Sequence, residues 1–161
     1  MIIRDEALAD QLAIHELHTL AFHGPAEAKL VDDLRQSGDM VISLIATEGD
    51  SILGHILLSK LGAPMRALAL APIAVHPDFQ RQGIGSVLIR NGLELARQGG
   101  WEAVFVLGDA GYYGRFGFSV EAAKGYISPY SGEHFMMLPL GLRTIPATGR
   151  LVYPAPFELL D

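Results

Sequence analysis

The chain contains 161 residues, of which half are hydrophobic and 19% are charged. This length is typical of one globular domain, and the apolar content excludes a disordered chain because it supplies enough surface for a core. Twelve basic against eighteen acidic residues give a net charge of −6, which argues against nonspecific binding to nucleic acid or anionic membranes. The absence of cysteine excludes disulfides, zinc–thiolate sites and thiol nucleophiles.

The chain also lacks the signals of a membrane or secreted protein. No apolar run approaches the roughly 18 residues that a membrane-spanning helix requires. The first residues include Asp5 and Glu6, where a signal peptide would carry positive charge. We therefore expect a cytoplasmic protein without a membrane partner. We expect one domain over residues 1–161, with a core at about 2–140 and an extension, 141–161, that packs on the core or trails from it.

The first third of the sequence predicts a strand, two helices and a hairpin. A short strand at Ile2-Ile3 leads into a helix over roughly residues 6–21, which His23-Gly24-Pro25 ends. A second helix ends near Gly38. Two strands, at 41–47 and 52–58, are joined by the turn residues Glu48-Gly49-Asp50-Ser51.

The rest of the chain alternates strands and helices. The predicted elements are a strand at 68–75, a helix that Gly99-Gly100 ends, a strand at 103–107, a short helix to about Phe116 and a strand at 135–138. Pro72 cannot donate a ladder hydrogen bond, so the strand at 68–75 should have a bulge or an unpaired edge there. This order of elements indicates an α/β (α+β) fold with a mixed sheet.

The segment Gln80-Arg81-Gln82-Gly83-Ile84-Gly85-Ser86 joins the strand at 68–75 to the following helix. Two glycines let the backbone approach a ligand, and a helix start offers unpaired N–H groups and a positive dipole end. Together they suit an anion, most naturally a phosphate, although a plain glycine-containing turn is the alternative. No Gly-Lys-Ser/Thr follows, which excludes a Walker loop, and Leu88 stands where a dinucleotide fingerprint needs glycine.

Two motifs in this half of the chain resemble those of a known family. Gln80 to Gly85 is similar to the Q/R-x-x-G-x-G/A signature of the GNAT superfamily of N-acetyltransferases, and Pro72 to Pro77 resembles its central strand. About thirty residues downstream, Tyr112-Tyr113-Gly114-Arg115-Phe116-Gly117-Phe118 resembles the family's L-Y-x-x-x-G-F segment. The order and spacing match, and the predicted elements agree from residue 2 to about 140.

The resemblance implies both a fold and an activity. The fold would be a mostly antiparallel mixed sheet flanked by helices, in which the central strand splays from the next. The activity would be acetyl-CoA-dependent N-acetyl transfer to a primary amine by direct attack in a ternary complex, because without cysteine the commonest covalent route is missing. The alternative is a catalytically silent acetyl-CoA-binding sensor or assembly module.

The same resemblance assigns the acetyl-CoA-binding residues and no metal. Backbone N–H groups from Arg81 through Ser86 would hold the pyrophosphate, and backbone groups of Ile73 and Val75 would pair with the pantetheine amides. The expected cofactor-binding set is Ile73, Ala74, Val75, Gln80, Arg81, Gln82, Gly83, Ile84, Gly85, Ser86, Asp109, Tyr113 and Phe116. Asp109 could instead cap the short helix.

Tyr113 matches the position of the family's general-acid tyrosine, so we expect it to protonate the departing thiolate, with Tyr112 mainly packing. The general base is not evident. Relatives place a glutamate on the central strand, but this chain has Ala69, Leu70, Ala71 and Pro72 there. His55 or an ordered water could take the proton instead.

The acceptor, a small-molecule or peptide amine, would bind between the first two helices and the last strands. The polar candidates there are His23, Glu27, Tyr130, Glu133 and His134. His15, His18 and His23 are close in sequence but lack an acidic ligand at a diagnostic spacing, so no metal site is predicted. The oligomeric state is open, with a homodimer among the alternatives.

Overall fold

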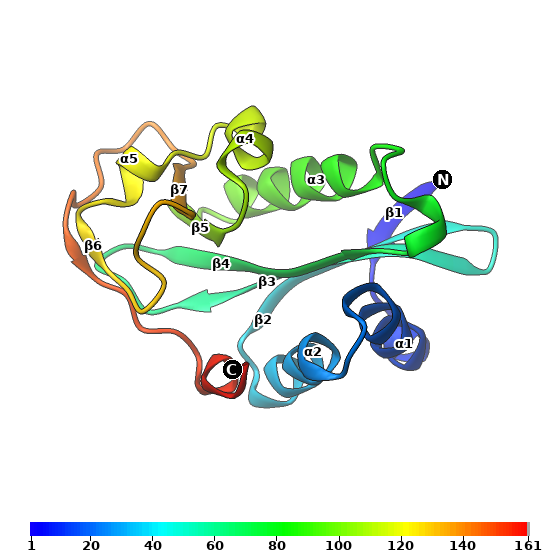
Figure 1. The fold of residues 1–161 in the computed structure, drawn as a ribbon. Helices are drawn as coiled ribbons and strands as arrows, with labels where there is room; N and C mark the ends of the chain where they lie inside the picture. Colours follow the sequence, from blue (N-terminus) through cyan, green and yellow to red (C-terminus); the bar gives the residue numbers. More distant parts are fainter. Residues whose placement is uncertain (161) are drawn as a thin grey trace.

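The computed structural model describes residues 1–160 and places a six-stranded sheet at the centre of the chain (Figure 1). The strand order is β1-β2-β3-β4-β5-β7, and every neighbouring pair is antiparallel except β4 and β5. The strands are β1 (Ile2–Asp5), β2 (Met40–Glu48), β3 (Ser51–Leu61), β4 (Ala67–Val75), β5 (Ala103–Leu107) and β7 (Phe135–Pro139). The predicted mixed, mostly antiparallel α/β fold is confirmed.

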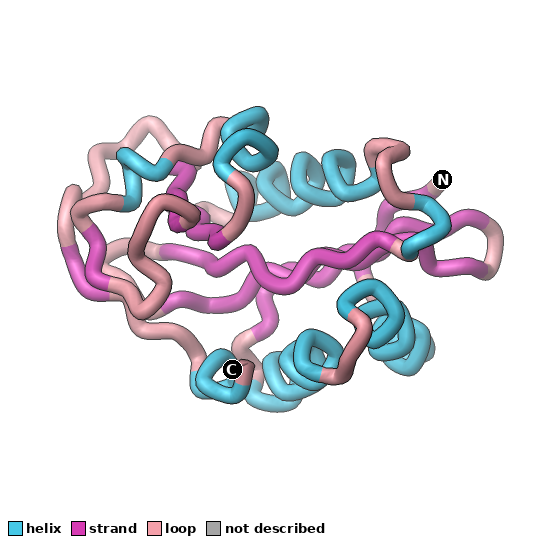
Figure 2. Tube along the Cα trace, in the orientation of Figure 1, coloured by secondary structure: helices cyan, strands magenta, loops and turns pink. Residues whose placement is uncertain are grey.

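Helices cover both faces of this sheet (Figure 2). One face carries α3 (Ile84–Gln98) and α4 (Ala110–Tyr113), and the other carries α1 (Gln11–Phe22) and α2 (Ala26–Ser37). Two apolar clusters result: Leu58 and Leu88 belong to the one beneath α3, and Ile14 and Leu57 to the one beneath α1 and α2. Because both faces are covered, the central strands are almost continuously apolar rather than alternating. No helix within residues 1–160 is long and apolar enough to cross a membrane.

The first helix starts later than the sequence predicts. The expected helix at about 6–21 begins only at Gln11, after a 3₁₀ turn, η1 (Leu8–Asp10). Asp10 accepts hydrogen bonds from the Ala7 N–H at 2.6 Å and from the guanidinium of Arg4. These side-chain contacts hold residues 7–10 in a turn, and Glu6 is held outside the helix by its own partners, described below.

β4 and β5 diverge after a short paired stretch. Only Ala67–Ala69 pairs with Ala103–Phe105, so the rest of β4 has a free edge on that side. β4 contains one extra residue relative to β3 at Ala71–Pro72. Ile56 pairs with Ile73, but Leu58, only two residues further along β3, pairs with Leu70. This is the bulge predicted at Pro72, and it accompanies the predicted splay.

The C-terminal residues fold back beside α2. A two-stranded sheet joins β6 (Tyr126–Ile127) to β8 (Gly149–Arg150), and a 3₁₀ turn, η4 (Ala155–Leu159), follows. Phe157 in η4 is only 4% exposed and belongs to the cluster beneath α1 and α2. The sequence does not predict these elements. Two short helical segments, α5 (Val120–Ala123) and η3 (Gly114–Phe116), complete this end of the molecule.

Candidate active site

The start of α3 forms a hollow suited to an anion. Gly83 precedes the helix with a φ of 84°, a conformation that favours glycine, and Ile84 is the first helical residue. The first N–H groups of the helix have no acceptor within it and point out of its start. Six of the predicted cofactor residues line this hollow, namely Val75, Gln80, Arg81, Gly83, Gly85 and Ser86, and Ile84 contributes there although its side chain is buried in the core.

Tyr112 and Arg115 also line this hollow, which the sequence did not predict. The hydroxyl of Tyr112 lies 3.4 Å from the Ser86 Oγ, and the Arg115 guanidinium stacks over the Tyr112 ring at 4.6 Å. Tyr112 therefore does more than pack. It brings a hydroxyl and an anchored cation to the rim of a site that otherwise consists of backbone amides.

The free edge of β4 leads away from this hollow. The His76 N–H donates to the Leu53 carbonyl of β3 at 2.8 Å, and backbone groups alternate between the two edges of a strand. The N–H and C=O groups of Ile73 and Val75 therefore point away from β3, into the splay. The backbone groups of Ala74 face β3 and are not on the open edge. Gln80 is tied to this segment through its side-chain amide, which donates to the Val75 carbonyl at 3.2 Å.

A second cavity, of about 400 Å³, lies at the other end of the splay. Residues 69–73 of β4 and 105–107 of β5 line its strand side, where Tyr113 of α4 also borders it. The other lining residues are mostly aromatic or aliphatic and come from α1, α2, the loop after β6 and the C-terminal segment. Val75 lines the anion hollow and Ile73 lines this cavity, so the free edge of β4 joins the two. An extended ligand could span them.

Tyr113 lies where the splay opens into the cavity. Its ring contacts Tyr112 and Phe118 edge to face, and its side chain is 8% exposed. Burial raises the pKa of the Tyr113 hydroxyl to about 12. That hydroxyl has no hydrogen-bond partner within residues 1–160, which leaves it able to donate to a ligand.

The other predicted cofactor residues lie around these two hollows. Asp109 caps α4, because its Oδ2 accepts the Tyr112 N–H at 2.8 Å. Phe116 packs edge to face against Tyr112 and lies 5.1 Å from the Arg90 guanidinium, at the edge of the anion hollow. Gln82 is exposed in the loop before α3 and its side chain does not line the hollow.

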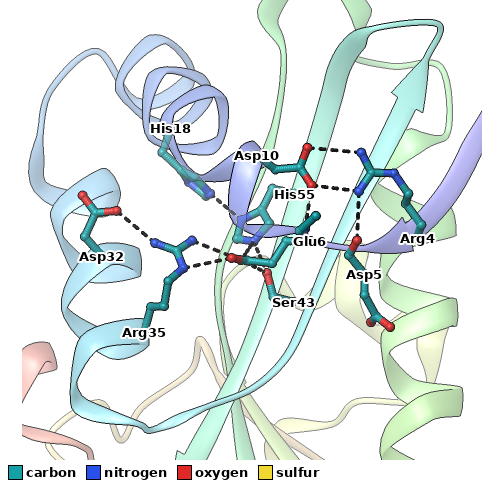
Figure 3. Close-up of polar contacts among 10 residues, drawn as sticks. Arg4, Asp5, Glu6, Asp10, His18, Asp32, Arg35, Ser43 and His55 are labelled. Carbon is teal, nitrogen blue, oxygen red and sulfur yellow. Dashed lines mark hydrogen bonds and ion pairs between the residues drawn. The ribbon is translucent and has the colours of Figure 1, made fainter.

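His55 cannot act as a base that touches the acceptor. Its side chain is 0% exposed and both ring nitrogens have partners: Nδ1 lies 2.8 Å from His18 Nε2, and Nε2 lies 2.7 Å from Ser43 Oγ (Figure 3). The cavity wall formed by β4, from Ala69 to Ile73, has no ionisable side chain.

The histidine pair belongs to a buried network that fastens α1 and α2 to the sheet (Figure 3). Glu6 accepts a hydrogen bond from the Ser43 hydroxyl and two from Arg35, at 2.9 and 3.1 Å. Partial burial raises the pKa of Glu6, but the nearby His55 ring, 3.8 Å away, and the hydrogen bonds from Arg35 and Ser43 outweigh it and lower that pKa to about 2. The sequence offered no signal for this network beyond polar residues in otherwise apolar strands.

The predicted acceptor residues are only partly brought together. Glu27 and Tyr130 line the cavity, whereas His23 and His134 do not, and Glu133 borders a separate hollow beside α5. Phe22, Tyr153 and Phe157 line the cavity although the sequence gave no reason to select them. Within the described part of the chain, no three acidic or histidine side chains gather where they could hold a metal ion.

Comparison with known proteins agrees with this geometry. A family model described as "Acetyltransferase (GNAT) family" matches residues 12–118. The N-acetyltransferase YjhQ of Escherichia coli is 38% identical over 93% of this chain and 90% of its own length. The N-acetyltransferase YhbS of the same species is 36% identical over 76% of this chain and 75% of its own length.

Solved structures show the same fold. A GNAT acetyltransferase from Brucella melitensis, in complex with acetyl-CoA, has a TM-score of 0.83 and 33% identity and covers 97% of each chain. YhbS from E. coli, in complex with CoA, has a TM-score of 0.89 and 31% identity over 98% of this chain and 91% of its own. The splayed sheet, the glycine-bounded helix start and these relatives lead to one conclusion: this chain is an N-acetyltransferase that belongs to the GNAT family.

Proposed function

We propose that the chain transfers the acetyl group of acetyl-CoA to a primary amine by direct attack in a ternary complex. The observation that carries this proposal is the free edge of β4, which joins the anion hollow at the start of α3 to the cavity beside Tyr113. The pyrophosphate would occupy the hollow, and the pantetheine arm would follow Ile73 and Val75. The thioester would then reach the cavity. Two solved relatives are complexes with acetyl-CoA and with CoA, which supports acetyl-CoA as the cosubstrate.

The helix start explains how an acidic protein could bind a polyanion. Backbone amides and the helix dipole carry fixed positive ends that do not depend on net charge. The amides of Gly85 and Ser86 would face the phosphates, and Arg81 and Arg115 would offset their charge at the rim. A net charge of −6 is therefore compatible with tight binding of CoA.

In the chemical step, a neutral amine in the cavity attacks the thioester carbonyl carbon. The new C–N bond forms and the C–S bond breaks. The nitrogen gives up one proton to water, and the sulfur leaves as a thiolate that must be stabilised or protonated. The Tyr113 hydroxyl would give that proton, and the position of Tyr113 at the border of the cavity supports this role. No covalent acyl-enzyme is needed, and the chain has no cysteine to form a thioester.

The test is release of free thiol from acetyl-CoA in the presence of a panel of primary amines, with mass spectrometry of the products. We expect thiol release only when an amine is present, and acetylated amine in equal amount. Intact-protein mass after incubation with acetyl-CoA alone should be unchanged. Binding of acetyl-CoA without turnover on any amine would contradict the proposal and favour a silent acetyl-CoA-binding module.

A further inference from the structure

The cavity beside Tyr113 has an aromatic wall built by three distant segments. Phe22 comes from the end of α1, Tyr130 from the loop after β6, and Tyr153 and Phe157 from the C-terminal segment. The ring centroids of Tyr130 and Tyr153 lie 4.9 Å apart, those of Tyr153 and Phe157 lie 5.2 Å apart, and both pairs meet edge to face. Because the rings support one another, the wall is formed before any acceptor binds.

One carboxylate stands beside this apolar wall. Among residues 1–160, Glu27 is the only charged side chain that lines the cavity, and it forms no ion pair with another described residue. It lies in the first turn of α2. One cation entering the cavity would therefore meet a partner. A second cation on the same molecule would lose water without gaining an opposite charge.

We infer that the acceptor is a monoamine with an apolar body, aliphatic or aromatic, rather than a polyamine or another acceptor with a second charge. Glu27 collects the ammonium group from solvent, and the body packs on the rings of Tyr153 and Phe157. The amine then loses its extra proton to water before it attacks. This inference rests on the proposed acetyl transfer. The size is suitable, because an apolar cavity of about 150 Å³ already holds benzene. The cavity here, at about 400 Å³, has room for a ring with a short arm beside the acetyl group.

The C-terminal segment is therefore a specificity-determining part of the site. Tyr153, Phe157 and Leu160 line the cavity, yet they lie well outside residues 12–118, which the family model matches. η4 packs against α2, the helix that carries Glu27. The packing of these two segments therefore fixes the position of the apolar wall relative to the carboxylate.

A matched pair of amines tests the inference. n-Hexylamine and hexamethylenediamine have the same carbon chain and differ by one amino group. With saturating acetyl-CoA and thiol release as the readout, we expect kcat/KM to be about tenfold or more higher for n-hexylamine, because the second ammonium of the diamine is desolvated without a partner. Equal values, or a preference for the diamine, would overturn the inference.

Substitutions test separately how the carboxylate and the aromatic wall contribute to binding of the amine. Glu27→Gln should raise KM for n-hexylamine about tenfold, the loss of a hydrogen bond to a charged group, with kcat and acetyl-CoA affinity kept. Glu16→Gln, at an exposed α1 position away from the cavity, is the control and should leave KM unchanged. An unchanged KM in Glu27→Gln would remove the carboxylate from the recognition of the amine.

The aromatic wall is tested by comparing KM for 2-phenylethylamine with KM for n-propylamine, whose carbon chain is too short to pack across the wall. Tyr153→Ala should raise KM for the aromatic amine at least fivefold more than for the short one. Tyr153→Phe keeps the ring, so it should change the two KM values by the same factor. If Tyr153→Ala fails to fold, Phe22→Ala tests the same wall at a position that is 41% exposed. Equal effects on both amines would overturn the role of the wall.

A failure of acetyl transfer can be separated from a failure of this inference. If no amine releases thiol, n-hexylamine and hexamethylenediamine are titrated into the protein with CoA present and their binding is measured by calorimetry. This measurement tests the preference of the cavity independently of acetyl transfer. Tighter binding of the monoamine would support the cavity's preference while the proposed transfer fails. Binding that is equal, or tighter for the diamine, would overturn the preference as well.

Discussion

The Nε2 atom of His18 lies 2.8 Å from the Nδ1 atom of His55, and neither side chain is exposed. The ionised Glu6 sets the direction of the hydrogen bonds that run from Ser43 through His55 to His18. Ser43 donates its hydrogen to Glu6, so its oxygen must accept from His55 Nε2. His55 Nδ1 is then without a proton and accepts from His18 Nε2. Both rings are thereby fixed as neutral tautomers, and His18 Nδ1 is a buried acceptor without a partner in the described chain.

This arrangement predicts that the fold loses stability in mild acid. Burial lowers the pKa of His18 to about 3 and also lowers that of His55. Below pH 6.5 these histidines bind protons in the unfolded chain but not in the folded chain. The free energy of unfolding therefore falls as pH falls from about 6.5 toward 3. For His18 alone, the loss between pH 7 and pH 5 is about 2 kcal/mol, and His55 adds to it in the same direction.

The measurement is urea unfolding at pH 7, 6 and 5. Glu6 does not contribute in this range, because its pKa is lowered and the stability it gives is lost only below pH ~4.5. His18→Gln should reduce the slope of the unfolding free energy against pH by up to the value for one proton. An unaltered slope in His18→Gln would mean that His18 is protonated in the folded protein.

Local patterns predicted much of the fold. The strand predicted at 103–107 is β5, since glycines bound an apolar run of strand length on both sides. Gly38 ends α2 in a left-handed conformation, with a φ of 81°, as its position predicted. The bulge at Pro72 followed from the missing N–H of proline. Each of these features depends on residues close together in the sequence.

The polar network and the cavity wall could not be predicted in the same way. Glu6 meets Arg35 across 29 positions and Ser43 across 37, and nothing in the local pattern of any of the three indicates the other two. Tyr153 likewise meets Tyr130 only because the C-terminal segment folds back beside α2. The anion hollow was accessible to sequence reasoning because its main parts lie within one loop and the first turn of one helix.

The start of α3 should not tolerate a negative side chain. A Cβ added at Gly85 would lie 3.2 Å from the Tyr112 hydroxyl, and both residues line the anion hollow. Gly85→Glu should therefore reduce acetyl-CoA affinity much more than Gly85→Gln, which has the same size without the charge. Ser86→Ala should cost only about one hydrogen bond, roughly 0.5–1.5 kcal/mol. Calorimetry gives all three values, and near-native binding by a folded Gly85→Glu protein would place the phosphates elsewhere.

Gly108 controls the position of Tyr113. A Cβ added at Gly108 would lie 2.5 Å from the Tyr113 ring, so Gly108→Ala must displace that ring. We expect about 1–3 kcal/mol lower stability from overpacking, and lower kcat with nearly unchanged acetyl-CoA affinity, because Gly108 does not line the anion hollow. Gly114→Ala is the matched control, because a Cβ there meets nothing within 4 Å. Wild-type kcat in Gly108→Ala would show that catalysis does not depend on where the ring lies.

Removing the Tyr113 hydroxyl should separate catalysis from cofactor binding. Tyr113→Phe keeps the ring contacts with Tyr112 and Phe118, so stability and acetyl-CoA affinity should hardly change. If the hydroxyl protonates the departing thiolate, kcat should fall by about 10²–10⁴-fold, the range for general acid catalysis. Tyr112→Phe is the comparison, because that hydroxyl faces Ser86 in the anion hollow and its loss should affect acetyl-CoA affinity more than kcat.

The pH profile of kcat gives an independent test of Tyr113. Burial raises the pKa of this hydroxyl to about 12, so it remains protonated, and able to donate, throughout the range in which the enzyme can be assayed. Activity should rise as the acceptor amine loses its proton and should show no fall near pH ~10, the ordinary pKa of a tyrosine. A fall in kcat near pH ~10 that disappears in Tyr113→Phe would show that the hydroxyl ionises there, and that bound acetyl-CoA offsets the effect of burial. Equal kcat values for wild type and Tyr113→Phe, measured where chemistry limits the rate, would exclude Tyr113 as the acid.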